Sequence, residues 1–169
     1  IPMLTREATA YRPPRFMWYP ETQFCYMRAG NMFLAAKGGH NNESHNHNDV
    51  GTCILSIDNV PLLIDAGVGT YTKKTFSSER YTIWTMQSNY HNLPIINGQP
   101  ESFGTQYHAT QVRADENRCI FTADIAKAYP EEAAVDSWIL AYQLQKNRLV
   151  ITDDYRLKMK KAPNQLNFM

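Results

Sequence analysis

Short runs of β-branched, aromatic and apolar residues recur along most of this chain, and each run ends after a few residues in a turn signal. The dipeptides Gly30-Asn31, Asp58-Asn59 and Asn97-Gly98 are the clearest of these signals. Only residues 126–135 hint at a helix, and a proline inside that segment argues against a long one. Many short strands with almost no helix predict an all-β fold, an antiparallel β-sandwich.

The turn signals divide the chain into its expected strands. In chain order these are residues 22–29, 32–37, 51–57, 60–65, 71–74, 81–86, 93–96, 107–114, 119–125, 138–145 and 149–157. The first two runs form one hairpin and the next two form a second. Residues 51–57 and 60–65 are apolar on both strand faces, which predicts that this second hairpin is covered on both sides.

A length of 169 residues with 43% hydrophobic composition suits one well-cored domain. Residues 1–21 contain four prolines and read as an extended linker or lead-in. Residues 22–169 are the β-sandwich domain. The run 165–169 begins a new alternating pattern and stops, so we expect the domain to be partial, cut at its C-terminus within a sheet. The first residues show no signal peptide, so the chain starts after processing or inside a longer product.

Charge and cysteine content exclude several classes of protein. Lys and Arg number 17 against 16 acids, and the resulting net charge of +1 is not that of a nucleic-acid or membrane partner. No apolar run is long enough to span a bilayer. The three cysteines are far apart, odd in number and without a CxxC pair, so we expect buried free thiols, which leaves the redox compartment open.

Residues 38–51 hold three of the five histidines of the chain beside two acids and four asparagines. So many nitrogen and oxygen donors in one segment indicate a site rather than packing. In an extended chain His45, His47 and Asp49 share one face, because successive side chains alternate. Asp65, which ends an apolar run, and His91 are two further candidates downstream.

A His, Asp, His set with a water in the fourth position is a known zinc arrangement. One difficulty is distance, because a regular hairpin around Asp58-Asn59 leaves His47 roughly 16 Å from Asp65 in a straight strand. The chain over residues 48–51 must therefore bend back, which its Asn, Asp and Gly residues permit. Hydrogen-bonded loop histidines are the alternative, but the clustering favours a metal. His40 and His108, which have no partner at a suitable spacing, are expected to be structural.

Three separated motifs in this order resemble the heparinase II/III family of polysaccharide lyases. They are ESHNHNDVG at residues 43–51, PLLIDAG at residues 61–67 and YHN at residues 90–92. The resemblance implies that His47, Asp65 and His91 are the ligands of one divalent metal ion, zinc or another, and that His45 lies at the catalytic cleft. It also implies a two-part enzyme in which an N-terminal α-helical toroid precedes the β-sandwich.

The activity implied by the resemblance is β-elimination on an acidic, uronic-acid-containing polysaccharide of the glycosaminoglycan type. A base removes the C5 proton while the C4 glycosidic oxygen leaves with a proton, and His45 serves as base or donor. The family's catalytic tyrosine lies in the toroid, which is missing here, so we expect this chain to be inactive alone. The polymer substrate implies a periplasmic or secreted location. The metal is expected to fix the loop that bears His45 rather than to touch substrate.

Two other classes of function remain open from the sequence. A non-catalytic carbohydrate-binding module would stack sugars on Trp18, Trp84 or Trp138, although isolated aromatics in strands are more often core. A small metal-dependent enzyme of the double-stranded β-helix type also carries histidines on a β scaffold. Just before His91, four further residues either line the cleft or only pack: Arg80, Tyr81, Trp84 and Gln87.

Overall fold

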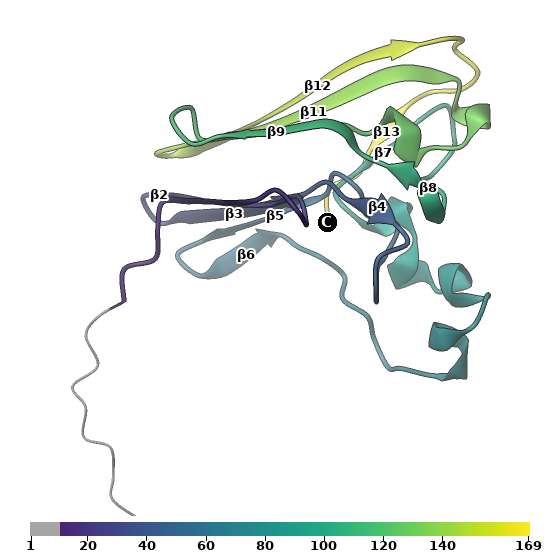
Figure 1. The fold of residues 1–169 in the computed structure, drawn as a ribbon, viewed down its shortest axis with the longest axis horizontal. Coiled ribbons are helices and arrows are strands. Elements are labelled where there is room, and N and C mark those ends of the chain that lie inside the picture. The colour runs from purple at the N-terminus through teal and green to yellow at the C-terminus, as the bar shows by residue number, and fades with distance from the viewer. Residues whose placement is uncertain (1–10) are drawn as a thin grey trace, which may run out of the picture.

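The computed structural model describes residues 11–169, and two antiparallel sheets face each other across one core (Figure 1). The first sheet has five strands in the order β1-β2-β3-β5-β6. These strands are β1 (Phe16–Tyr19), β2 (Phe24–Ala29), β3 (Met32–Lys37), β5 (Cys53–Ile57) and β6 (Val60–Leu63). The expected antiparallel β-sandwich is confirmed.

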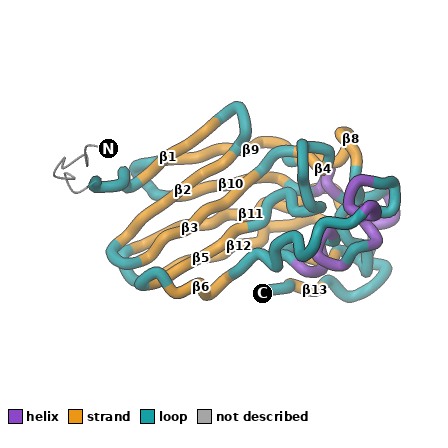
Figure 2. The backbone as a smooth tube through the Cα atoms, turned by 90° about the horizontal axis from the view of Figure 1, so that it is seen from below, coloured by secondary structure: helices purple, strands orange, loops and turns teal. Residues whose placement is uncertain are grey.

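The second sheet has four strands in the order β12-β11-β10-β9. They are β9 (Thr110–Asp115), β10 (Ile120–Asp124), β11 (Val135–Gln145) and β12 (Arg148–Leu157). Two small pairs lie beyond the ends of the main sheets: β4 (His40–Asn41) pairs with β8 (Gly104–His108), and β7 (Pro94–Ile95) pairs with β13 (Gln165–Leu166). Figure 2 shows these pairs and the helical turns gathered at one end of the sandwich.

The turns follow the chemistry of their dipeptides. Gly30 alone has a positive φ, 63°, in its two-residue loop, which is the pattern of a type II′ turn. Asp58 and Asn59 both have positive φ, 53° and 64°, the pattern of a type I′ turn. Both turns join strands in the expected register, with Ala29 opposite Met32 and Ile57 opposite Val60.

The core lies between the inner faces of the two sheets. Its largest fully buried side chains include Trp138, Tyr142, Phe121, Met27 and Leu34. The cysteines Cys25, Cys53 and Cys119 are buried free thiols, as expected. Among the residues that the structure describes, no helix has the length and apolar character needed to cross a membrane.

The prediction of strands over residues 71–74 and 81–86 is wrong. The segment folds instead into four short 3₁₀ turns, η1 (Lys73–Phe76), η2 (Arg80–Thr82), η3 (Trp84–Met86) and η4 (Ser88–Tyr90). Each turn closes with backbone bonds between residues three apart, as from the Ile83 amide to the Arg80 carbonyl at 3.0 Å. β-Branched and aromatic content favours strands only where a neighbouring strand is present to pair. The helical hint over residues 126–135 becomes two more such turns, η5 (Ala126–Ala128) and η6 (Glu131–Ala133).

Two other expectations need correction. The lead-in over residues 1–21 contains β1, which pairs with β2 from Phe16 to Tyr19, because alternating aromatic residues can cover the core edge; residues 1–10 lie outside the described part. The hairpin of β5 and β6 is not covered on both sides, since Ile54 is exposed on the outer face of β5 and Val60 and Leu62 are exposed on the edge strand β6. The second sheet lies on one side of the first, so only one face of this hairpin meets the core.

Candidate metal centre and cleft

The histidine-rich segment forms a bent loop between β4 and β5, not a single extended strand. Its bend ends at Gly51, whose φ of 91° is a conformation that L side chains rarely adopt. A Cβ atom there would lie 2.7 Å from Ile125 and 2.9 Å from Leu140, so the loop also packs closely on the second sheet. The Thr52 amide donates to the Asp49 carbonyl at 3.1 Å and closes the turn. The expected return of the chain over residues 48–51 is therefore present.

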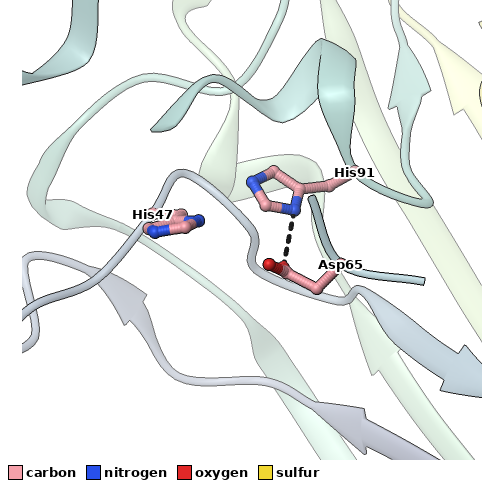
Figure 3. A group of neighbouring side chains, drawn as sticks. All are labelled: His47, Asp65 and His91. Carbon is pink, nitrogen blue, oxygen red and sulfur yellow. Dashed lines mark ion pairs between the residues drawn. The ribbon is translucent and has the colours of Figure 1, made fainter. Parts of the chain in front are cut away.

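This bend brings His47 together with Asp65 and His91 (Figure 3). One donor atom from each residue lies within 4.8 Å of the others. His47 comes from the loop after β4, Asp65 follows the end of β6, and His91 follows η4. His47 and His91 are buried, with ring centroids 5.3 Å apart, while the Asp65 carboxylate is partly exposed. Asp65 was expected to end a buried strand, but the end of β6 is on the surface.

The donor atoms of this group fit a divalent ion. Both ring nitrogens of His91 are buried without a hydrogen-bond partner among the described residues. Its Nδ1 lies 3.0 Å from Oδ2 of Asp65 but outside hydrogen-bond geometry. That separation is close to the roughly 3.3 Å between two ligands of a tetrahedral zinc ion with bonds of about 2.0 Å. Unsatisfied buried nitrogens are rare and need an explanation, and an ion supplies one.

The protonation states of two members suit metal binding. Burial lowers the pKa of His47, and the nearby His91 and Arg80 lower it further against the opposing effect of Asp49 and Asp65. The His91 imidazole is the largest cause that lowers the pKa of Asp65 to about 2, assisted by the Gly67 amide and opposed by burial. A neutral imidazole and an ionised carboxylate are the forms that coordinate a metal.

His45 lies beside this group at an open cavity of about 320 Å³. Its side chain is exposed and its φ is 60°, an uncommon conformation for a residue other than glycine. The cavity is lined by polar side chains from the loop and by the ends of β3 and β5; its members include Lys37, Glu43, Ser44, His45, His47, Asp49 and Asp65. The candidate catalytic histidine and two candidate metal ligands therefore border one hollow.

Lys37 and Asp49, which both line this cavity, form an ion pair of 2.8 Å. Burial opposes the charge of Lys37, but Asp49 and, to a smaller extent, Glu43 and Glu101 raise its pKa overall. The paired lysine remains cationic and lines the same cavity as His45 and His47. Sequence reasoning did not single it out, because a lysine that ends a strand reads as a surface residue.

Glu101 is a second residue that sequence reasoning missed. It is 4% exposed, and its Oε2 accepts from the Asn41 side chain at 3.0 Å and from the Val50 amide at 3.1 Å. It thus joins β4 to the end of the histidine-rich loop. Burial raises the pKa of this carboxyl well above its usual value, against the lowering effect of its hydrogen bonds. No spacing in the sequence connects residue 101 with residues 41 and 50.

Asn92 supports the metal group from the other side. Its side-chain amide donates to the Cys53 carbonyl at 2.8 Å and to the Ile64 carbonyl at 3.0 Å. Its Oδ1 accepts from the Met169 amide at 2.8 Å. The residue that follows His91 therefore holds the chain that precedes Asp65, which keeps two of the three candidate ligands in register.

The remaining sequence candidates lie elsewhere. His40 and His108 are opposite each other in the β4–β8 pair, so these expected structural residues are partners in a small sheet. Trp138 is core and Trp18 is partly buried against Phe121 at a ring distance of 6.1 Å, so Trp84, 53% exposed, is the most open to a sugar of the three tryptophans in the described residues. Arg80 and Tyr81 do not border the cavity; they bind the loop from behind.

Comparisons with solved structures agree with this fold. A mutant of heparan sulfate lyase HepC from Pedobacter heparinus superimposes with a TM-score of 0.68 at 16% sequence identity, over 89% of this chain and 23% of that one. A heparinase III gene product gives 0.67 at 15% identity, over 89% and 23%. Another heparinase III structure gives 0.61 at 16% identity, over 86% and 23%. This chain thus spans less than a quarter of the length of these lyases, and at such identities the likeness establishes the fold.

The comparison with curated protein sequences gives no match. The comparison with family models matches residues 11–164, nearly the whole described chain, to the model for the C-terminal part of heparinase II/III-like proteins. The chain belongs to the heparinase II/III-like, C-terminal family.

Proposed function

We propose that this chain is the β-sandwich part of a polysaccharide lyase that cleaves uronic-acid-containing, glycosaminoglycan-like polymers by β-elimination. The observation that carries the proposal is the cavity that His45 shares with the His47, Asp65 and His91 group. The solved relatives of this fold include a heparan sulfate lyase. A cavity that holds an exposed histidine beside a fixed group of side chains suits an elimination, which needs a positioned proton carrier.

In this mechanism His45 contacts the substrate. Its imidazole either accepts the proton from C5 of the uronate or donates one to the C4 oxygen as that bond breaks. The electron pair left at C5 forms the C4–C5 double bond as the C4–O bond breaks. When His45 is the base, the catalytic tyrosine of the missing toroid would donate a proton to the leaving oxygen; when His45 is the donor, that tyrosine would accept the C5 proton. Charge that develops on the uronate carboxylate needs positive groups and donors nearby, and Lys37 is the cation at this cavity.

His47, Asp65 and His91 would hold one divalent ion, and zinc suits this donor set. When bound, the ion would supply a fixed positive charge and would hold the loop in place through its coordination bonds. His47 is two residues from His45, so coordination of the ion by His47 would restrain the position of the exposed His45 imidazole. The rings of His47 and His91 are buried, so these two side chains lie too deep to reach a sugar.

The missing partner in this proposal is an N-terminal α-helical toroid that carries the catalytic tyrosine. A cleft built from one wall of the sandwich is open, so this chain alone should be inactive. The substrate polymer places the complete enzyme in the periplasm or outside the cell. A carbohydrate-binding module is the competing function, and the single exposed tryptophan gives it little support.

Two measurements test the proposal. Elemental analysis of the purified chain should find about one equivalent of zinc or a similar ion, which His47→Ala loses and His108→Ala keeps. In the full-length protein, His45→Ala should abolish release of unsaturated uronate, followed by its ultraviolet absorbance, while the metal content stays at one equivalent. Full activity in the His45→Ala protein would refute the catalytic role, and sugar binding without turnover by the unaltered full-length protein would favour the binding module.

A further inference from the structure

Asn46, the residue between His45 and His47, is held on every side. Its backbone carbonyl accepts two hydrogen bonds from Arg80, at 3.2 Å from Nε and 2.9 Å from Nη2. Its side-chain Oδ1 accepts from the Tyr81 hydroxyl at 2.9 Å. Its side-chain amide donates to the His47 carbonyl at 2.8 Å. Asn46 is 9% exposed, so these bonds replace water almost completely.

The two residues that hold Asn46 are themselves fixed. Arg80 uses its remaining nitrogen, Nη1, to donate to the Thr75 carbonyl at 2.9 Å. The Tyr81 ring stacks on Phe103 at a centroid distance of 4.7 Å. The Tyr81 carbonyl accepts from the Gln87 side chain at 3.0 Å. The side chains that bind Asn46 are therefore themselves held in place by contacts within the segment of 3₁₀ turns.

The backbone conformation of His45 explains why the hydrogen bonds to Asn46 are needed. His45 has a φ of 60°, a left-handed conformation that is strained for an L residue. Such a conformation persists only where the surroundings impose it. Arg80 binds the carbonyl of Asn46, which belongs to the peptide that joins Asn46 to His47, so releasing it would free the backbone between the two histidines to turn.

We propose that Arg80 and Tyr81 are positioning residues that set the direction of the His45 and His47 side chains through Asn46. The proposal rests on the proposed function in one respect, that His47 binds a metal. Arg80 suits the task because a planar guanidinium can bind one carbonyl twice and a second carbonyl at once, which the single ammonium of lysine cannot do.

The test uses Arg80→Lys and Tyr81→Phe, each with a matched control on β12. Arg156→Lys removes a guanidinium from an exposed ion pair with Asp136. Tyr155→Phe removes a hydroxyl from a ring that stacks on Trp138 at a centroid distance of 4.3 Å. Two quantities are measured: hydrogen exchange at the Asn46 and Asn48 amides of the metal-free chain, and zinc affinity with the absorption spectrum of the cobalt-substituted chain. Both amides donate to backbone carbonyls, at 3.3 Å and 2.9 Å, so they report the loop directly.

Each variant should speed exchange at these two amides about tenfold, leave β10 and β11 protected, weaken zinc binding about tenfold and alter the cobalt spectrum. The controls should change none of these. Unchanged exchange and unchanged affinity in both variants would overturn the proposal, as would uniform acceleration across all strands, which marks a structural role only. If the unaltered chain binds no zinc while exchange still responds, the positioning role stands and the metal site of the proposed function fails.

Discussion

At the scale of single residues, the left-handed backbone of His45 predicts an order of stabilities. His45→Gly should be more stable than His45→Ala by about 1 kcal/mol, because glycine adopts a φ of 60° without the Cβ clash that alanine keeps. His45→Asn should fall between them. Urea unfolding of the metal-free chain measures these differences.

The control for His45 is the exposed residue Asn42, which is not among the residues with positive φ. There the order should reverse, with Asn42→Ala at least as stable as Asn42→Gly, because glycine only adds freedom to the unfolded chain. Equal stabilities for the glycine and alanine variants of His45 would mean that the loop relaxes and that no strain is held there.

Glu101 predicts a pH dependence of stability. Its pKa is raised in the folded chain by burial, so the folded state keeps a proton that the unfolded state releases near the ordinary value of 4.5. The stabilising effect is complete below that pH and is lost as the pH rises toward the folded pKa. Relative to Glu101→Gln, the metal-free chain should therefore lose unfolding free energy as the pH rises from 4.5.

Glu101→Gln keeps an oxygen for the Asn41 and Val50 donors, so it removes the charge and spares the hydrogen bonds. Glu116→Gln, in an exposed turn, is the control and should follow the unaltered chain at every pH. Denaturant unfolding at a series of pH values measures the difference. A constant gap between the chain and Glu101→Gln across this range would show that residue 101 does not change its proton on folding.

At the scale of elements, the two hairpin turns predict opposite responses to substitution. Gly30→Ala should cost about 1–2 kcal/mol, because the φ of 63° disfavours a Cβ and the Lys146 carbonyl would lie 3.2 Å from it. Asn59→Gly should stabilise the chain by up to about 1 kcal/mol, since glycine suits the second position of a type I′ turn. Thermal unfolding measures both, and a loss of stability in Asn59→Gly would contradict the assigned turn.

The strands that were predicted most accurately are those next to these turns. Where a turn dipeptide separates two alternating runs, as at Gly30-Asn31 and Asp58-Asn59, the strands lie within two residues of their expected ends. Between residues 70 and 92 no partner strand is available, and similar residue types form 3₁₀ turns. The pairing of β7 with β13, which joins residues 94–95 to 165–166, depends on contacts that no local pattern records.

Some residues of the candidate site could likewise be predicted from the sequence, and others could not. His45 and His47 could be found because they lie two residues apart among other donors, and the structure adds Asp65 and His91 to His47 as expected. The supports could not be found, because Glu101 reaches Asn41 and Val50 across more than fifty positions, and Arg80 reaches Asn46 across thirty-four. Such contacts follow from tertiary packing and leave no periodic trace in the chain.

At the scale of the whole molecule, a bound ion would connect directly three segments that are otherwise held together by packing and hydrogen bonds. These are the loop after β4, the chain beyond β6 and the chain beyond η4. The unfolded chain has no such cluster, because His47 and His91 are separated by 44 positions. Zinc should therefore stabilise the folded state by about 2.7 kcal/mol at a concentration one hundred times its dissociation constant. For a chain of this size that is a rise in melting temperature of roughly 5–10 °C.

Calorimetry of the chain with zinc and with a chelator measures this rise. His91→Ala should melt lower than the unaltered chain and lose the response to zinc, because it removes a buried ligand and leaves a hole of ring size. His108→Ala, on the β4–β8 pair outside the cluster, should keep the full response. A rise of the same size in His91→Ala would place the zinc elsewhere on the molecule. A rise confined to proteins that retain His47, Asp65 and His91 would instead mean that the ion links the exposed edge of the first sheet to the 3₁₀ segment, and thereby sets the wall on which His45 is presented.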